Sequence, residues 1–392
     1  MRIGIDCRFW GIEHAGLGRY TKELVLNLLK VDKKNNYFLF LRQGRGREIK
    51  KGKRVKKVIF NVPHYSLKEQ LLFPGEINKY NLDLFHFPHF NVPILLWRTP
   101  FIVTIHDLIK HFFKGRTVTT RNLLAYSIKR AGYHLVIDKA IKKAKAIIVP
   151  SYFVKDQVVV HYPSVEDKIR VIYEGVGEPY ISTWHVANSA LKKVKKNYEP
   201  SATSYERLLR KYKIKKPYFI YVGNVYPFKN VPLLLQAIKH FKNTQLVIVC
   251  ARDVFWERLE REVKKMGLDK NVIMPGRLSD KKLAVFFKNA TAFVTASLME
   301  GFGLPGLEAL AAGCPVLAAR AGSLPEIYGE VATYFDPNDI DELVKKMKQA
   351  LEFSKGRKGK IIKKGRKQAK RYSWRKTAKE TLGIYNSIIC NR

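Results

Sequence analysis

The chain has 392 residues with a hydrophobic content of 46% and a formal net charge of +40. That length points to two domains rather than one, and the hydrophobic content is ordinary for a globular protein with a packed core. The charge indicates a negatively charged partner, either a membrane surface or nucleic acid, unless it reflects a general basic bias of the source organism.

Cysteine usage and apolar patterning exclude several classes of protein. The four cysteines lie far apart without a C-x-x-C pair, so neither a metal site nor a disulfide framework is predicted, which fits a reducing cytoplasm. Asp6 interrupts the N-terminal apolar residues too early for a signal peptide. No apolar run approaches the ~20 residues that a membrane span needs. Any membrane contact is therefore expected to be peripheral, on the inner face of the cell membrane.

Residues 1–177 are predicted to form a first α/β domain. Arg2–Asp6 is typical of a short buried strand, a turn with Gly16 and Gly18 follows, and Tyr20–Leu29 has helical spacing. Ligands of such domains bind at the carboxyl ends of the strands, so this turn is expected to face a cleft. The further predicted strands are Tyr37–Leu41, Val58–Val62, Leu82–Phe87, Phe101–Ile105, Ala146–Pro150 and Ile169–Glu174.

Histidines follow two of these strands. His106 comes directly after Phe101–Ile105, while His86 and His89 lie near the end of Leu82–Phe87. A histidine at the carboxyl end of a strand lies where chemistry is done, and the alternative is a structural histidine with satisfied hydrogen bonds. We expect His106, rather than the other two, to belong to the active site.

Residues 121–145 have helical composition, with basic side chains interleaved with Leu124, Ile128 and Ile141. Such a surface could dock on anionic lipid, to which each basic residue adds ~1 kcal/mol. An ordinary packed helix with a solvated face explains the pattern equally well. Ser151 is predicted to cap the helix that follows.

A connection at 178–217 precedes a second α/β series at 218–371. Tyr218–Val222 is a predicted strand, Gly223 and Asn224 follow it, and a helix beginning near Lys229 runs through Phe241. Lys229 would place a positive charge on a diphosphate; the alternative is a surface lysine. The further predicted strands are Leu246–Val249, Val272–Met274, Ala292–Ala296, Val316–Ala319 and Glu330–Phe335.

The turn after Ala292–Ala296 contains the largest group of candidate ligand-binding residues. It reads Glu300-Gly-Phe-Gly-Leu304, and a helix is predicted from Pro305 to Gly313. Glycine lets backbone N–H groups approach a ligand, and the helix N-terminus favours an anion. Glu300 and Glu308 frame this turn, which would suit a ligand with hydroxyls on both sides of a phosphate, such as a sugar nucleotide. The alternative is a tight turn followed by a solvated Glu308.

The C-terminal part contains a pair that resembles a metal motif. Asp339-Ile-Asp341 fits a D-x-D metal signature, but its position before the helix Asp341–Leu351 favours capping, and no catalytic metal or other cofactor is predicted. Residues 355–371 are densely basic, and a last helix at 372–392 is expected to pack back on the N-terminal domain.

These motifs resemble glycosyltransferase family 4, the retaining enzymes of the GT-B fold. Glu300…Glu308 around GFGLP resembles the family's E-x7-E signature, and the likeness continues from Ser297 through Pro325. GLGRY at Gly16, TIHDL at His106 and VGN…KN at Gly223 resemble further family patterns. The likeness implies two Rossmann-like domains facing each other across a cleft.

The resemblance also implies roles for individual residues. Glu300 and His106 would position the transferred hexose, Glu308 the ribose hydroxyls, and Lys229 the diphosphate. Amides of Gly301, Phe302, Gly303 and Leu304, with the turns at Gly16, Gly18 and Gly223, would approach hexose or phosphate. The family often has an arginine near the glycine where this chain has Asn224 and then Phe228, and Arg277 is a candidate to compensate.

The reaction implied is transfer of a hexose, with mannose expected first, from a GDP-, UDP- or dTDP-hexose to a hydroxyl. Retention without a protein nucleophile implies front-face attack, and the acceptor is expected to be a cell-envelope glycan or lipid-linked oligosaccharide beside an anionic membrane. A GT-B-fold epimerase or phosphorylase is an alternative. A basic nucleic-acid binder is a second one, although no nucleic-acid module is recognised and no nucleic acid is expected as partner.

Overall fold

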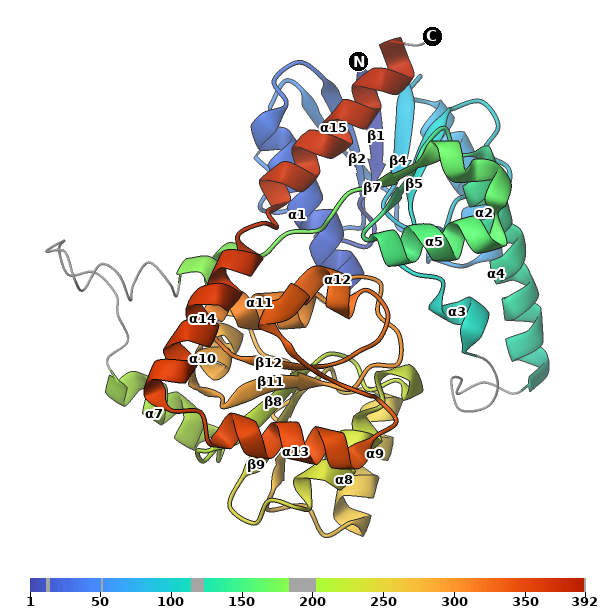
Figure 1. Cartoon of the computed structure of the whole chain (residues 1–392). Helices are drawn as coiled ribbons and strands as arrows, with labels where there is room; N and C mark the ends of the chain where they lie inside the picture. Colours follow the sequence, from blue (N-terminus) through green and yellow to red (C-terminus); the bar gives the residue numbers. More distant parts are fainter. Residues whose placement is uncertain (12–14, 51, 114–122, 183–201, 391–392) are drawn as a thin grey trace, which may run out of the picture. The chain divides into compact units, whose positions relative to one another are not determined.

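The computed structural model describes residues 1–11, 15–50, 52–113, 123–182 and 202–390. The chain divides into two compact units (Figure 1). Unit 1 comprises Met1–Phe112, Arg121–Gly175 and Ser373–Arg392, and unit 2 comprises Phe113–Thr120 and Val176–Tyr372. Each unit is a parallel sheet with helices on both faces, so the predicted pair of Rossmann-like α/β domains is confirmed.

Unit 1 is built on a seven-stranded parallel sheet with the order β3-β2-β1-β4-β5-β6-β7. The strands are β1 (Arg2–Asp6), β2 (Asn36–Leu41), β3 (Val55–Ile59), β4 (Leu84–Phe87), β5 (Phe101–Thr104), β6 (Ile147–Val149) and β7 (Ile169–Val171). The helices are α1 (Ala15–Val31), α2 (Leu67–Asn78), α3 (Ile109–Phe112), α4 (Leu123–Lys143), α5 (Tyr152–His161) and α15 (Trp374–Cys390). Right-handed crossovers place α1 on one face and α2, α4 and α5 on the other.

Unit 2 is built on a six-stranded parallel sheet with the order β10-β9-β8-β11-β12-β13. The strands are β8 (Tyr218–Val222), β9 (Gln245–Val249), β10 (Val272–Ile273), β11 (Ala292–Thr295), β12 (Val316–Ala319) and β13 (Thr333–Phe335). The helices are α7 (Ala202–Lys211), α8 (Val231–Ile238), α9 (Val254–Lys265), α10 (Asp280–Asn289), α11 (Leu304–Ala312), α12 (Leu324–Tyr328), α13 (Ile340–Leu351) and α14 (Lys355–Ala369).

Strand order reverses once in each sheet. In unit 1 the chain runs outward from β1 to β3 and then restarts at β4 beside β1. In unit 2 it runs outward from β8 to β10 and then restarts at β11 beside β8. The loops after the two central strands diverge at such a switch point, which leaves a crevice at the carboxyl edge of the sheet where ligands bind.

Helix α15 returns from the end of the sequence to cover unit 1, beside α1 (Figure 1). A side chain on Gly175 would place its Cβ 2.1 Å from the backbone nitrogen of Trp374, so glycine is required where the returning chain passes. Thr377 Oγ1 donates to the Tyr173 carbonyl at 2.7 Å. Deeper in the unit, Tyr385 Oη lies 2.7 Å from His86 Nδ1. The helix is therefore held by buried polar contacts as well as by apolar packing.

Two predicted elements begin several residues earlier than expected. Helix α1 begins at Ala15 rather than Tyr20, so the glycines of the expected turn lie in its first turns. Strand β3 begins at Val55 and includes two lysines, which an edge strand tolerates because its outer side faces water. The predicted Ser151 cap is confirmed, since its Oγ accepts from Val154 N at 3.2 Å.

None of the helices in the described part of the chain combines the length and the apolar character that a membrane-spanning segment needs.

Candidate functional site

The loops that follow β8 and β11 meet at the switch point of unit 2. The first begins at Gly223, whose φ of +150° favours glycine. The second lies beside it, because Leu298 N donates to the Phe228 carbonyl at 2.8 Å. Tyr221, near the end of β8, donates through its hydroxyl to the Asn224 carbonyl at 2.5 Å. Both loops are thereby fixed at the carboxyl edge of the sheet.

Two charged side chains from these loops meet directly. Lys229 Nζ lies 2.6 Å from Glu300 Oε1, and the two side chains are 15% and 17% exposed. Ser297 Oγ donates to the same carboxylate oxygen at 2.8 Å. Within the described residues, no group donates to Glu300 Oε2, and Glu300 is the one acceptor of the Lys229 ammonium. Each side chain thus keeps hydrogen-bonding capacity for a ligand.

The turn after Glu300 presents backbone groups rather than side chains. Phe302 is buried against Tyr372, with ring centroids 5.8 Å apart, so its side chain belongs to the core. Gly303 has φ +86°, and a Cβ there would lie 2.6 Å from the Tyr328 hydroxyl. Leu304 then opens α11, with Pro305 at its start as predicted. The turn therefore delivers the helix N-terminus, which favours an anion, to the edge of the sheet.

Glu308 lies one turn into α11 and is 3% exposed. The alternative of a solvated helix residue is therefore wrong. Glu308 belongs to the helix that opens at the glycine turn, and its role toward a ligand remains a prediction.

A third loop, which sequence reasoning did not single out, braces Glu300. Gly322 follows β12 with φ +59°, and a Cβ there would lie 2.7 Å from the backbone nitrogen and oxygen of Glu300. The next residue, Ser323, donates its N–H to the Glu300 carbonyl at 3.1 Å. Tyr328 donates its hydroxyl to the Gly303 carbonyl at 2.6 Å. The resemblance to the family, which extends through Pro325, was the sequence signal that marked this loop.

Arg277, the candidate to compensate for the missing family arginine, follows a strand that is not adjacent to β8. Arg277 is exposed and follows β10, which is separated from β8 by β9. Adjacent strands are ~4.8 Å apart, so this separates Arg277 from β8 by roughly 10 Å at the level of the sheet. Arg252 follows β9, one strand nearer, and stacks over the Trp256 ring at 5.3 Å. Arg277 remains a prediction, and Arg252 is a second cation at the same edge.

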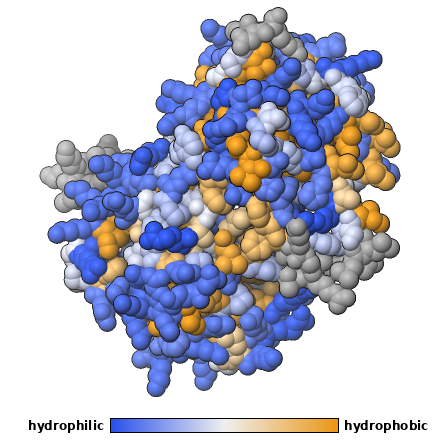
Figure 2. All heavy atoms as spheres, turned by 45° about the vertical axis from the view of Figure 1, so that its right-hand side comes forward, coloured by the Kyte–Doolittle hydropathy of each residue, from blue (hydrophilic) through white to orange (hydrophobic). Residues whose placement is uncertain are grey.

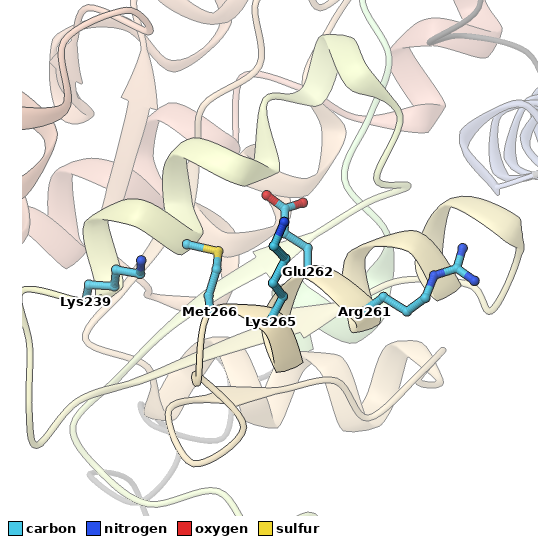
Figure 3. A pocket seen from close by; sticks show the side chains of 5 residues that line it. All are labelled: Lys239, Arg261, Glu262, Lys265 and Met266. Carbon is cyan, nitrogen blue, oxygen red and sulfur yellow. The ribbon is translucent and has the colours of Figure 1, made fainter.

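A surface hollow in unit 2 lies elsewhere. Three cations, one carboxylate and a methionine line it, namely Lys239, Arg261, Glu262, Lys265 and Met266 (Figure 3). These residues belong to the C-terminal ends of α8 and α9, which lie at the edge of the sheet opposite to the carboxyl ends of the strands. The hollow is thus separate from the Lys229–Glu300 pair.

In unit 1, His106 is held from both sides of its ring. Nδ1 lies 3.1 Å from Glu174 Oε1, and Nε2 lies 2.9 Å from the Pro88 carbonyl oxygen. Burial acts to lower the pKa of His106, but the hydrogen bond and charge of Glu174 outweigh it, and the pKa is raised. Both acceptors suit the imidazolium, which donates from both nitrogens. The geometry therefore favours the charged imidazolium and leaves neither ring nitrogen of His106 free to act as a base.

The other two candidate histidines are held in the neutral form, and of these His86 is buried while His89 is half-buried. His86 lies between the Tyr385 hydroxyl and Thr104 Oγ1, 2.9 Å from its Nε2, and burial lowers its pKa to about 3. His89 contacts the Tyr65 hydroxyl at 2.7 Å through Nε2, and burial lowers its pKa as well. His86 joins β4, β5 and α15, which is a structural role.

The two glycines of the N-terminal motif differ from each other. Gly16 is exposed, with open space around the position of a Cβ. Gly18 is buried, and a Cβ there would lie 2.0 Å from the Gly11 carbonyl oxygen. Gly18 therefore allows the loop after β1 to pass close to α1, and this packing alone requires glycine at the position.

Asp339 of the D-x-D pair caps a helix. Asp339 Oδ1 accepts a hydrogen bond from Glu342 N at 2.9 Å, at the start of α13. Asp336, at the end of β13, accepts from Asn338 N at 2.8 Å in the same turn. Asp339 therefore satisfies an N–H group in the first turn of the helix, as the sequence predicted.

Comparison with known proteins identifies both halves of the chain. Residues 15–178 match Glycosyltransferase Family 4, and residues 205–368 match Glycosyl transferases group 1. The O-antigen chain mannosyltransferase B of Escherichia coli is 26% identical over 322 residues, covering 80% of this chain and 76% of that protein. The O-antigen chain mannosyltransferase RfbU of Salmonella typhimurium is 25% identical, covering 64% of this chain and 60% of its own length.

Solved structures share the fold over essentially the whole chain. A sucrose-phosphate synthase from Thermosynechococcus elongatus superposes with a TM-score of 0.76 at 18% identity, covering 100% of both chains. Anabaena Alr3699/HepE in complex with UDP-glucose superposes with a TM-score of 0.72 at 15% identity, covering 99% of this chain and 100% of that one. These likenesses establish the GT-B type of architecture, two Rossmann-like α/β domains.

Proposed function

The chain belongs to the group 1 and family 4 glycosyltransferases, and from this premise we propose that it transfers a hexose from a nucleotide sugar to an acceptor hydroxyl. The observation that carries the proposal is the Lys229–Glu300 pair, 2.6 Å apart at the switch point of unit 2. A cation, a carboxylate and a helix N-terminus meet there, and a diphosphate linked to a sugar offers a partner to each.

Departure of the nucleoside diphosphate generates negative charge. Lys229 and the amides at the start of α11 would stabilise that charge electrostatically, in a site fixed before the reaction. Glu300 Oε2 would accept from a hydroxyl of the transferred hexose, while Oε1 keeps Lys229 and Ser297 in place. Glu308 would accept from the ribose. His106 is the residue of unit 1 that we propose for catalysis, and its raised pKa favours the charged imidazolium.

Mannose is the proposed hexose, because mannosyltransferases are among the relatives that align over most of this chain. A cell-envelope glycan or a lipid-linked oligosaccharide is the proposed acceptor, since the relatives build O-antigen chains. The net charge of +40 supports a cytoplasmic location beside an anionic membrane surface. We further propose retention at the anomeric carbon and independence of a metal ion.

The test combines purified protein with a panel of GDP-, UDP-, dTDP- and ADP-linked hexoses and an envelope glycolipid extract. Release of nucleoside diphosphate together with a product heavier by one hexose supports transfer. NMR of the new anomeric proton then distinguishes retention from inversion, and a chelator arm tests the metal. An epimerised donor without transfer, or sugar phosphate formed from inorganic phosphate, would instead indicate the two alternative activities.

A further inference from the structure

Large apolar side chains are exposed almost entirely on unit 1. Of the exposed large hydrophobic residues in the described part of the chain, all but Val254 belong to that unit. Figure 2 shows apolar surface gathered in patches between hydrophilic residues on the side of α2 and α4. Single exposed apolar residues are ordinary, but a contiguous group indicates an interaction surface.

Six of these residues define what we call the amphiphilic face of unit 1. They are Leu67, Leu71 and Leu72 of α2, Trp97, and Ile128 and Leu135 of α4. Leu67 is 83% exposed and Trp97 is 72% exposed. The opposite face of α2, with Phe73 and Ile77, packs into the core, so α2 is apolar on both sides.

Contacts join the three segments into one surface. Gln70 of α2 accepts from Ile94 N at 2.7 Å through Oε1. Lys139 of α4 donates to the Ile94 carbonyl, and its Nζ lies 3.6 Å from the centroid of the Trp97 ring. On α4, Ile128, Leu135 and Lys139 share one side of the helix, because residues seven and eleven positions apart nearly coincide around its axis. Trp97 therefore lies between the leucines of α2 and the outer side of α4.

The same face is cationic. Exposed basic residues accompany the apolar ones on every segment, namely Lys68, Arg98, Lys129, Lys142 and Lys143. Asp138 and Glu76, the nearby acids, are each already engaged, with Lys142 at 3.8 Å and Lys79 at 2.7 Å. A second copy of this face would bring like charges together, which disfavours self-association. Aliphatic residues, an interfacial tryptophan and surrounding lysines instead match the boundary of an anionic bilayer.

We propose that the amphiphilic face of unit 1 docks on an anionic lipid bilayer. The leucines and Trp97 enter the boundary between headgroups and acyl chains, and the lysines and Arg98 contact the phosphates. This face differs from the surface expected from the sequence, because Ile141 is buried in the core and α2, which was not expected to take part, supplies half of the apolar residues. The side chain of Leu124 lies outside the described residues.

The test is flotation of the full chain with phosphatidylcholine vesicles that either contain or lack phosphatidylglycerol, without donor or acceptor. Failure here is thus independent of the proposed transfer reaction. We expect binding only with the anionic lipid, weakened by high salt. Leu71→Ser with Trp97→Ser should reduce binding at least ten-fold. Lys142→Gln with Lys143→Gln should reduce it about 25-fold, since each lysine contributes about five-fold.

Val254→Ser is the matched control, because Val254 is 45% exposed but lies in unit 2, and it should bind like the wild type. Circular dichroism of each variant checks that the fold is kept. Equal binding to neutral vesicles, no binding, or binding unchanged by both double variants would overturn the proposal. Sedimentation of a dimer that Leu71→Ser with Trp97→Ser dissociates would assign the face to a second copy instead.

Discussion

The two units use the carboxyl edges of their sheets in different ways. In unit 2, Lys229 and Glu300 pair with each other while one carboxylate oxygen and part of the ammonium remain open to a ligand. In unit 1, His106 has both ring nitrogens engaged, and His86 is sealed between Thr104 and Tyr385. The comparison teaches that a polar residue at the end of a strand does not always offer free hydrogen-bonding atoms to a ligand, since partners within its own unit can occupy them.

The largest effect is expected at the open pair. Lys229→Met should lower the rate of transfer roughly 10²–10³-fold, the typical loss for one electrostatic stabiliser of developing charge. Steady-state kinetics with the preferred donor measures this. Lys239→Met, in the hollow at the opposite edge of the sheet, is the control and should leave the rate unchanged (Figure 3). Equal losses of transfer rate in Lys229→Met and Lys239→Met would contradict a specific role of Lys229 in the site.

The second effect concerns stability, at Gly303 in the glycine turn that follows Glu300. Gly303→Ala is expected to destabilise the protein by about 2–6 kcal/mol, since a left-handed alanine costs about 1–3 kcal/mol and the contact with Tyr328 a similar amount. Denaturant unfolding measures the change. Gly359→Ala, in α14 with open space around it, should instead stabilise by about 0.5–1 kcal/mol. A neutral Gly303→Ala would show that the turn is not constrained.

The contribution of the His106–Glu174 pair to the stability of unit 1 should depend on pH. The folded pKa of His106 is raised, so its pairing with Glu174 stabilises the fold fully below the unfolded pKa of about 6.5 and is lost as pH rises through the folded value. Glu174→Gln should therefore cost about 2 kcal/mol at low pH and less at high pH. Melting temperatures of both proteins between roughly pH 5 and pH 9 test this. A difference independent of pH would mean that the pair is uncharged.

The smallest expected effect is at the helix cap. Asp339→Ala should destabilise by about 1 kcal/mol, the typical value for an N-cap, and leave transfer unchanged. Comparing unfolding with kinetics separates the two effects. A large loss of transfer activity at unchanged stability would contradict the capping role and indicate that the D-x-D pair belongs to the active site.

The sequence was most informative where function and local structure coincide. Buried strands followed by glycine and a helix predicted both units, and β8 and β12 have the predicted boundaries. Pro305 and Gly313 marked the start and end of α11 because proline suits the first helical turn and glycine the left-handed cap.

Contacts between distant segments could not be predicted in this way. Tyr328 supports Gly303 from 25 residues away, and Tyr385 meets His86 across 299 residues. Lys229 and Glu300 were each singled out, but their pairing depends on the order of strands in the sheet, which hydrophobic periodicity does not specify. The exposed leucines of α2 were missed because apolar residues in a helix are ordinarily assigned to the core.

The most direct test of the central claim is calorimetric titration of the wild type, Lys229→Met and Lys239→Met with GDP, UDP, dTDP and ADP. The account predicts that one nucleoside diphosphate binds the wild type and Lys239→Met alike, and that Lys229→Met binds it at least ten-fold more weakly. Unchanged affinity in Lys229→Met would contradict the assignment of the diphosphate to the switch point of unit 2.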